Sequence, residues 1–482
     1  MRLASDAMKR LFIAVVALVG AGGCGRELPP VGQVRLFVDT DATVPASPDD
    51  ITPDEGPPPL FDTLIVDVYE PSADTPCEGC TRAFAIDEGM LRAREVSFGI
   101  PAEPGVDGYV VRLRLYQAAA TLTGDVPAAT DQGPPPSVID RWVSLPTVSD
   151  EGIVDAHVLL GTDQVGVPLG SLQEPLEIER GPVTSSQVGT WPGAQRVTCA
   201  GEPREGEVCV PGGAFWMGHP RAIGVGLGDA WDQRRLVKLA PFYLDQQEVT
   251  VAQWRAYQPD GGPEVTAWSG GSTGDALLDY CTFTTVPGPR DAMPVVCLTV
   301  EGARGYCQAQ GKDLPTEAQL EYVAGGLASR LFVWGSDEPN CEDAVLRRYG
   351  YGIFLDLGLA GCEPDVPPGG AEVVGGLLDE KRRDRLALMG GEIYDLVGNV
   401  SEWALDRWNR QGEPCWSAGG VYVDPLCAQD SPADGSFPVF RLGSFAVGSR
   451  QAIAAARAFI DSDVAKNGNG IDLGFRCARP GI

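Results

Sequence analysis

Histidine is nearly absent from this sequence of 482 residues, in which His157 and His219 are the only two. Their scarcity argues against a metal site built from three histidines, and against a histidine-centred catalytic triad in the second half of the chain. Basic residues are also few, because 37 Lys and Arg stand beside 66 Asp and Glu and give a net charge of −29. Nucleic acids and acidic lipids bind basic surfaces, so the sequence predicts neither as a partner.

Long apolar runs are missing as well, and the one notable run, residues 11–20, is too short to cross a bilayer as a helix. Lys9 and Arg10 precede it, and Ala21-Gly22-Gly23-Cys24 follows it. A basic pair, a short apolar run and small residues are typical of an export signal. The end of this segment resembles a bacterial lipoprotein signal, which implies that Cys24 carries lipid and becomes the mature N-terminus.

We therefore predict a signal peptide over residues 1–23 and a tether over 24–30, with a lipid anchor in a membrane. The alternative is an ordinary cleaved signal that is followed by an unrelated cysteine. By resemblance to Gram-negative lipoproteins, Arg26 in place of an aspartate implies sorting to the outer membrane. The expected location is the cell envelope, outside the cytoplasm.

Cysteine is plentiful, with 13 in the chain, and setting Cys24 aside leaves an even number in an exported protein. That combination predicts disulfides, although sequence alone does not fix their connectivity. A zinc site at the Cys77-Glu-Gly-Cys80 segment is disfavoured, because no second cysteine pair at metal spacing follows nearby. Cys307 and Cys477 are left over when neighbours are paired. The plausible neighbouring pairs are Cys77 with Cys80, Cys199 with Cys209, Cys281 with Cys297, Cys341 with Cys362, and Cys415 with Cys427.

The first part of the mature chain has no long segment of helical periodicity. Between residues 110 and 116 apolar residues alternate with arginines, which is the pattern of a half-buried strand. Together with the abundance of Gly and Pro, this predicts a small, antiparallel, all-β sandwich over residues 31–165 that serves as a spacer or binding module. Residues 166–196 are rich in Gly, Pro, Ser and Gln and predict a linker. The other strand-like runs are 34–38, 64–69, 142–145 and 154–160.

The remaining residues, 197–482, predict one further domain in which three short helices are separated by long Gly-rich stretches. Thr250-Val-Ala-Gln253 and Thr316-Glu-Ala-Gln319 each fit a capping box that opens a helix. A third helix is expected from Val300 to Gln310, ending at Gly311.

Several motifs follow one another in this second domain, and their order carries more information than any one of them. Together they resemble the formylglycine-generating enzyme family, also called the sulfatase-modifying factor family, over nearly the whole domain. The resemblance implies an α+β, C-type-lectin-like fold with little regular structure. The motifs are VPGGAFWMG at 210–218, PFYLD at 241–245, EVT at 248–250, PVV at 294–296, residues 303–307, GKDLPTE at 311–317, WG at 334–335, YDLVGN at 394–399, SEW at 401–403, RLGS at 441–444 and GFRC at 474–477.

The family's enzymes oxidise a cysteine of an unfolded sulfatase to formylglycine with O₂, using a Cu(I)-binding cysteine pair located between the RLGS-like and GFR-like motifs. Soft thiolates suit Cu(I) and can exchange with the substrate thiol. Here no cysteine occurs between Cys427 and Cys477, so the pair is missing and copper is not expected. Cys415 and Cys427 are a conceivable replacement, although an exported pair at that spacing is more often a structural disulfide. Another branch of the family holds iron with several histidines, which two histidines cannot supply.

The resemblance also assigns structural sites. It implies that Cys307 and Cys477 form a disulfide, and it places a calcium site in residues 395–402. There Asp395 and Glu402 would supply side-chain oxygens, and Gly398 and Val400 backbone carbonyls. Oxygen ligands on a tight loop suit Ca²⁺, although Asp395 capping a turn beside a solvated Glu402 is the simpler alternative.

We therefore predict a lipoprotein whose second domain is a non-catalytic, calcium-stabilised module that binds a peptide, protein or glycan in a lectin-like cleft. Ser444, Arg450 and Arg457 are the polar candidates for lining that cleft. The alternatives are an oxidoreductase that converts Cys to formylglycine with relocated cysteines, and a structural component of an envelope assembly.

Overall fold

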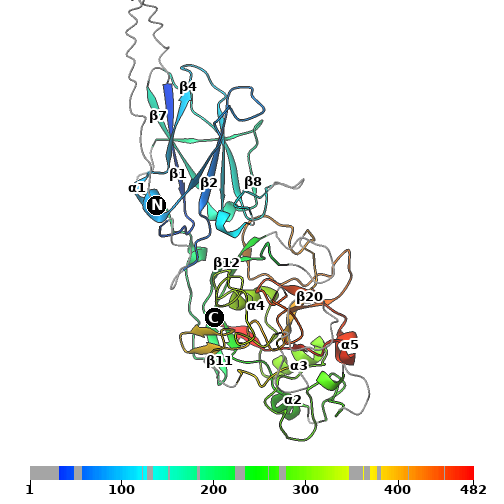
Figure 1. The fold of residues 1–482 in the computed structure, drawn as a ribbon. Coiled ribbons are helices and arrows are strands. Elements are labelled where there is room, and N and C mark those ends of the chain that lie inside the picture. The colour runs from blue at the N-terminus through cyan, green and yellow to red at the C-terminus, as the bar shows by residue number, and fades with distance from the viewer. Residues whose placement is uncertain are drawn as a thin grey trace, which may run out of the picture.

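The computed structural model describes the chain in segments. These are residues 32–47, 57–121, 123–127, 134–149, 152–181, 185–222, 234–258, 260–270, 278–346, 362, 370–376, 381–410, 412–449 and 451–482. Two bodies stand end to end (Figure 1), with the strands coloured blue to cyan in one and the later elements in the other. The predicted signal peptide, tether and lipidated Cys24 lie outside the described residues.

Two sheets form the first body. One has the strand order β10-β7-β1-β4 and the other β3-β2-β5-β6-β8, with β9 also pairing with β6. The six-residue helix α1, Glu88–Ala93, lies between β3 and β4 in the chain. The strands are β1 Gly32–Thr40, β2 Thr63–Tyr69, β3 Arg82–Ala85, β4 Ser97–Ala102, β5 Val110–Tyr116, β6 Ile139–Ser144, β7 Ile153–Leu160, β8 Pro168–Leu169, β9 Leu176–Glu177 and β10 Glu179–Arg180.

The alternation in β5 produces the half-buried strand that it predicts. Val111, Leu113 and Leu115 are buried in the core, whereas the two arginines between them face outward and pair with Asp140 and Asp67. The expected purely antiparallel arrangement is wrong, because β1 pairs with β7 in parallel along eight residues. Strand direction depends on which segments meet in space, and alternation within a strand carries no information about that.

The segment 166–196 is not the expected free linker. Its strands β8 and β9 add to β6, and β10 adds to β7. Val188, Trp191 and Ala194 are buried in the same hydrophobic cluster as β1 and β5. Two-residue strands are too short to show periodicity, and their pairing is fixed by neighbours elsewhere in the chain.

The second body combines small sheets with short helices, and its sheets run β11-β14-β22, β12-β13-β18, β15-β16 and β20-β19-β17-β21. The helices are α2 Val251–Tyr257, α3 Val300–Ala309, α4 Glu317–Ala324 and α5 Ser462–Val464. The strands are β11 Glu207–Val210, β12 Gly213–Met217, β13 Arg235–Leu239, β14 Phe242–Asp245, β15 Leu386–Leu388, β16 Gly391–Ile393, β17 Ser401–Arg407, β18 Tyr422–Val423, β19 Pro438–Arg441, β20 Arg457–Phe459, β21 Leu473–Gly474 and β22 Ala478–Pro480.

The three predicted helices are present where expected. Thr250 and Thr316 cap α2 and α4, and each is part of a complete capping box with a glutamine three residues later. Thr299 caps α3, which ends just before Gly311 with its φ of 68°. No helix among the described residues combines the length and apolar character needed to span a membrane.

All twelve cysteines of the described residues form disulfides. The structure contains every neighbouring pair predicted from the sequence, together with the bond between Cys307 and Cys477 that the resemblance implies. Across a separation of 170 residues, this last bond joins α3 to the segment just before β22.

The two bodies share a hydrophobic core. Trp216 in β12 lies against Phe61 with ring centroids 5.6 Å apart, and its indole N–H donates to the carbonyl oxygen of Leu60 at 3.0 Å. Ala214 and Leu236 belong to the same buried cluster as the strands of the first body. The junction is therefore a packed interface with directional hydrogen bonds.

Candidate functional site

A polar cavity of about 270 Å³ opens beside β14, α2 and α3 in the second body. Four amide side chains line it, from Gln246, Gln247, Gln253 and Gln310. An amide group offers both donors and acceptors, so such a lining can bind a neutral polar ligand in more than one orientation. Charged groups and one aromatic ring complete the wall, namely Arg204, Glu205, Asp245, Glu248, Tyr306 and Lys312.

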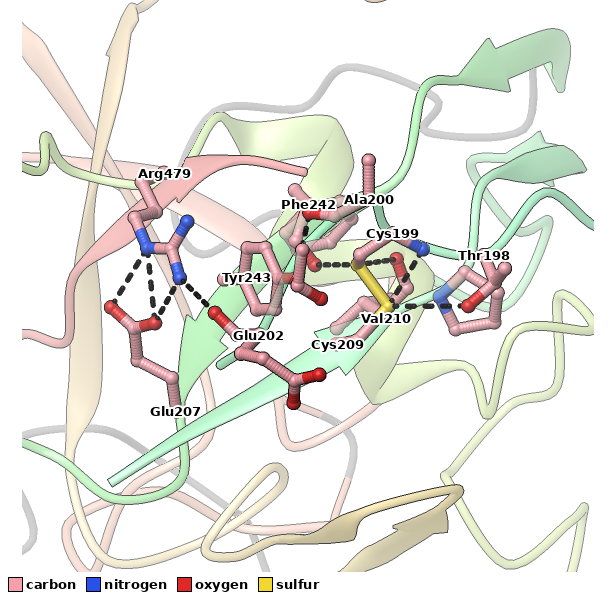
Figure 2. The surroundings of a disulfide bond; sticks show 12 residues. Thr198, Cys199, Ala200, Glu202, Glu207, Cys209, Val210, Phe242, Tyr243 and Arg479 are labelled. Atoms are coloured by element: carbon pink, nitrogen blue, oxygen red, sulfur yellow. Dashed lines mark hydrogen bonds and ion pairs between the residues drawn. A yellow bond between two sulfur atoms is a disulfide. The ribbon is translucent and has the colours of Figure 1, made fainter. Parts of the chain in front are cut away.

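A cluster of ion pairs and hydrogen bonds around Glu207 adjoins this cavity, because Arg204 and Lys312 both line the cavity and contact Glu207. Figure 2 shows part of this cluster. The Arg479 guanidinium lies 3.8 Å from the centre of the Tyr243 ring and donates to Glu207 in β11. The disulfide between Cys199 and Cys209 fixes the segment before β11 to that strand. Burial alone would raise the pKa of Glu207, but its hydrogen bonds from Arg479, Arg204 and Lys312 lower it to about 2.

The lining of the cavity includes a carboxyl group with an unsatisfied oxygen. Glu248 is 1% exposed, and its Oε1 accepts a hydrogen bond from Asn399 at 3.1 Å. Its Oε2 is buried without a hydrogen-bond partner among the described residues. Burial raises the pKa of Glu248 well above its usual range, and the nearby Asp395 raises it further.

The loop before β17 contains the predicted calcium ligands, and all four are present in the described part of the chain. Asp395 adopts a φ of 57°, and its Oδ2 accepts the N–H of Gly375 at 2.5 Å. A Cβ at Gly398 would lie 2.7 Å from the backbone nitrogen of Val345, so the chain needs glycine there. Val400 is buried at the end of the loop.

The simpler interpretation of this loop, in which Glu402 faces solvent, is wrong. The carboxylate is buried, and its Oε1 accepts hydrogen bonds from Nε and Nη2 of Arg476 at 2.8 and 2.7 Å. Burial raises the pKa of Glu402, whereas the charge of Arg476 opposes that rise. The GFRC motif therefore pairs with the SEW motif in space.

Asp384 is a further buried carboxyl group beside this loop. Its Oδ2 has no hydrogen-bond partner among the described residues and lies 3.2 Å from the position of a Cβ on Gly398. Burial, with the negative charge of Asp395, raises the pKa of Asp384 to about 8. Burial likewise raises the pKa of Asp395.

The chemistry of these carboxyl groups decides whether Ca²⁺ could bind at the loop. Glu248, Asp384, Asp395 and Glu402 are all buried, and unpartnered oxygens of two of them lie near the loop. Hard oxygen donors match the needs of Ca²⁺, and they already have two cationic neighbours, Arg476 beside Glu402 and Arg382 at 3.8 Å from Asp384. Within the described ranges, however, no three His, Cys, Asp or Glu side chains are grouped closely enough to hold a metal by themselves. The chemistry of the donors fits, provided that backbone carbonyls complete the set.

Two of the predicted cleft residues are structural instead. Ser444 is fully buried and donates to Asp472, and Arg457 is buried against Glu317. Neither lines the polar cavity described above. Their polarity suggested a cleft, but a buried polar side chain that has a partner serves the core equally well. Arg450, the third candidate, lies outside the described residues.

Much of the described chain that follows Ser444 is aliphatic and buried. Val447, Ala452, Ile453 and Ala456 pack in one hydrophobic cluster with Trp408. Such side chains offer neither a metal ligand nor a nucleophile. The described part of this stretch is therefore part of the core.

A family model of the sulfatase-modifying factor enzyme 1-like domain matches residues 195–355 and 385–480, more than half of the chain. The chain belongs to this family. The formylglycine-generating enzyme of Streptomyces coelicolor is 28% identical over 311 residues, which cover 58% of this chain and 91% of that enzyme. The inactive C-alpha-formylglycine-generating enzyme 2 of Bos taurus is 28% identical over 234 residues, covering 42% of this chain and 70% of that protein.

Among solved structures, that of PvdO from Pseudomonas aeruginosa is similar at 21% identity, with a TM-score of 0.33, and covers 57% of this chain and 94% of that one.

Within the sulfatase-modifying factor domain, sequence reasoning missed Glu248, Asp384 and Arg476 as members of the site. Glu248 belongs to the EVT motif and Arg476 to the GFRC motif, so the motifs themselves could have indicated that these residues belong to the site. Asp384 stands in none of them, and only the folded loop brings it close to Gly398.

Proposed function

We propose that this protein is an envelope lipoprotein whose sulfatase-modifying factor domain has no oxidase activity and serves as a binding module. One observation carries the proposal: every cysteine of the described residues is already in a disulfide. It is supported by the aliphatic core that much of the described stretch after Ser444 forms. Formylglycine formation by the family's route needs a thiol pair for Cu(I) and for exchange with substrate. A relative that is named as inactive makes such a member plausible.

Relocated cysteines are the rival explanation, and Cys415 with Cys427 is the candidate pair. These two are bonded to each other, and Cys427 is 1% exposed. Its backbone N–H donates to the buried carboxyl group of Asp406 at 2.8 Å. A sulfur in this position is poorly placed to meet a substrate thiol, which supports a structural role.

Calcium is the proposed cofactor of this module, and copper is not. The ligands would be Asp395, Glu402 and the carbonyl oxygens of Gly398 and Val400, with Asp384 as a fifth oxygen donor nearby. When bound, Ca²⁺ would neutralise buried carboxylates that otherwise stay protonated or repel one another.

The amide-lined cavity is the proposed binding site, in place of the cleft at Ser444 and Arg457. Its glutamines suit a polyhydroxylated or amide ligand, and Tyr306 offers an aromatic face. We favour a glycan over a peptide, because vicinal hydroxyl groups match side chains that both donate and accept. A glycan array tests this choice: the wild type should bind glycans, and the Gln247→Ala variant should bind them less. Binding to peptides alone would show that the ligand is a peptide.

The first body, proposed as an all-β sandwich spacer, would hold this module away from a membrane in which lipid on Cys24 is anchored. Labelling with radioactive palmitate in a Gram-negative host checks the anchor, with Cys24→Ala as the unlabelled control. Separation of inner and outer membranes then tests the proposed outer-membrane location. If the protein is released in soluble form, the signal is an ordinary cleaved one.

An activity assay is the decisive test of whether the sulfatase-modifying factor domain lacks oxidase activity. The mature protein is incubated with Cu(I), O₂ and a peptide containing Cys-x-Pro-x-Arg, and mass spectrometry measures conversion of the cysteine to the aldehyde. The Streptomyces coelicolor enzyme serves as the positive control. We expect an unchanged peptide. Aldehyde formation that disappears in Cys415→Ser would instead establish an oxidase with relocated cysteines.

A structural role in an envelope assembly is the remaining alternative. Mild crosslinking in cells followed by purification distinguishes it, because an assembly component would yield stoichiometric protein partners. A glycan-binding module would not.

A further inference from the structure

A second cavity, of about 280 Å³, lies where the two bodies meet. One wall comes from the second body, through Trp216, Pro220 and Arg234. The other comes from the first body, through Tyr116, Gln117, Ala120, Thr121, Thr123, Asp125, Val126, Pro127 and Ser137. The cavity is lined by side chains from both, so it exists only when the two bodies are packed together. It is separate from the amide-lined cavity and shares no residue with it.

Arg234 is the unusual member of this lining. It is 7% exposed, and its only hydrogen bond among the described residues runs from Nη1 to Oε1 of Gln117 at 2.7 Å. Its Nε is buried without a hydrogen-bond partner, and the described acidic residues that act on its charge, Asp62 and Glu321, form no ion pair with it. A buried guanidinium without a counter-charge is costly, and proteins usually pair such groups.

The guanidinium is nonetheless held firmly in place. It lies over the ring of Trp216 at 5.2 Å from the centroid, and Trp216 is itself fixed by its bond to Leu60. Gln117, which receives the Arg234 hydrogen bond, donates through Nε2 to the carbonyl oxygen of Pro59 at 3.0 Å. A donor held in this way can receive an anion with little loss of side-chain entropy.

The charges around Arg234 are of both signs, and none of the described carboxylates forms an ion pair with it. Burial lowers the pKa of Arg234 to about 9, so it remains charged at neutral pH, and Asp62 and Glu321 act on it only from a distance. Burial, together with Arg234 and Arg221, lowers the pKa of His219 to about 4. Among the described residues, Asp125 is the one acidic residue that lines the cavity, and it is exposed.

We propose that this junction cavity binds a small monocarboxylate, whose carboxylate group pairs with Arg234 and whose apolar body lies against Tyr116, Val126 and Trp216. Guanidinium groups bind carboxylates through paired, charge-assisted hydrogen bonds, and Arg234 has unused N–H groups for this purpose. The apolar side chains favour a ring or branched chain over acetate. The ligand would also stabilise the packing of the two bodies, because it binds only the assembled junction.

The test uses the mature protein and isothermal titration with benzoate, phenylacetate and N-acetylphenylalanine, each beside its neutral amide. We expect one acid-binding site, with amides at least about tenfold weaker because they lack the charge that Arg234 recognises. Arg234→Gln should remove acid binding, and Asp125→Asn should strengthen it by removing a like charge. Arg304→Gln, in an exposed ion pair with Asp313, is the matched control and should bind normally.

A third variant keeps the test decisive if Arg234→Gln does not fold. Ala120→Trp fills the cavity from the opposite wall and leaves Arg234 in place, so it should abolish binding while the melting temperature of the second body is kept. Equal binding of acids and amides, or acid binding that survives Ala120→Trp, would overturn the proposal. So would the absence of binding by all three acids to the folded wild-type protein.

Discussion

The indole N–H of Trp216 donates to the carbonyl oxygen of Leu60 at 3.0 Å, across 156 positions of sequence and from one body of the protein to the other. Both residues are buried, with Leu60 fully enclosed. In a buried interface the loss of either partner leaves the other unsatisfied, which costs more than the bond itself contributes. This contact therefore couples the stability of the two bodies.

Trp216→Phe keeps an aromatic ring at the junction and removes the donor. We expect a loss of about 1–3 kcal/mol of unfolding free energy, because the Leu60 carbonyl is left buried and unpaired. Hydrogen exchange should then become faster in β2 and β5 as well as in β12. Trp254→Phe removes a similar bond, to Gly261 at 3.2 Å, but inside the second body. Exchange in β5 that rises equally in both variants would refute this coupling.

The disulfide between Cys307 and Cys477 closes a loop of 170 residues and should contribute more than the short ones. Replacing both cysteines by serine should lower the unfolding free energy by about 4–5 kcal/mol, as loop-closure entropy predicts. The same double change at Cys77 and Cys80, which are separated by three positions, is the control and should cost far less. Denaturation in urea measures both, and similar losses would contradict this explanation.

Glu317 is the anion that neutralises two buried arginines. It is completely buried and accepts hydrogen bonds from Arg441 at 3.0 Å and Arg457 at 2.9 Å. Glu317→Gln should destabilise the protein by about 3–5 kcal/mol, because Arg457 loses its ion-pair partner and Arg441 keeps only Glu321. Glu88→Gln breaks only the exposed pair with Arg92, and should change the unfolding free energy by less than about 0.5 kcal/mol. Thermal denaturation compares the two variants directly.

Asp406 should make stability depend on pH. Burial, with the charge of Glu317, raises its pKa from 3.8 to about 7, against the opposing hydrogen bonds from the backbone N–H groups of Cys427 and Glu317. The folded protein thus holds a proton that the unfolded chain releases at lower pH. This stabilisation is complete below about pH 4 and is lost as the pH rises through about 7, amounting to about 4 kcal/mol at most.

The variant Asp406→Asn tests this dependence, because an amide does not titrate. Its unfolding free energy should vary less with pH than that of the wild type between about pH 4 and pH 8, although it starts lower, since the amide nitrogen cannot accept a hydrogen bond. Parallel curves for the two proteins would show that Asp406 keeps its ordinary pKa.

Calcium should raise the melting temperature of the second body. At a calcium concentration about a hundredfold above the dissociation constant, the gain in unfolding free energy is about 2.7 kcal/mol. Asp395→Ala should remove the response, whereas Asp313→Ala, which changes an exposed ion pair, should keep it. Identical melting in calcium and in chelator would exclude the proposed site.

The features that the sequence determined alone are local or carried by recognisable motifs. The capping boxes at Thr250 and Thr316 start helices because their hydrogen bonds join residues three positions apart. Alternation in β5 places its apolar side chains in the core, because successive side chains of a strand point to opposite faces. The family followed from motifs in a fixed order, with enough certainty to place the disulfide between Cys307 and Cys477.

Only the tertiary structure decided which distant segments meet. It paired β1 with β7 in parallel, built residues 166–196 into the first body, and buried Ser444 and Arg457 in the core. It also placed Arg234 against Gln117 from the other body, without a carboxylate partner in the part of the chain that the structure describes. Such contacts depend on how whole surfaces pack and on which groups lose their water. A residue's type and its near neighbours in sequence do not contain that information, because burial and partnership are properties of the folded chain.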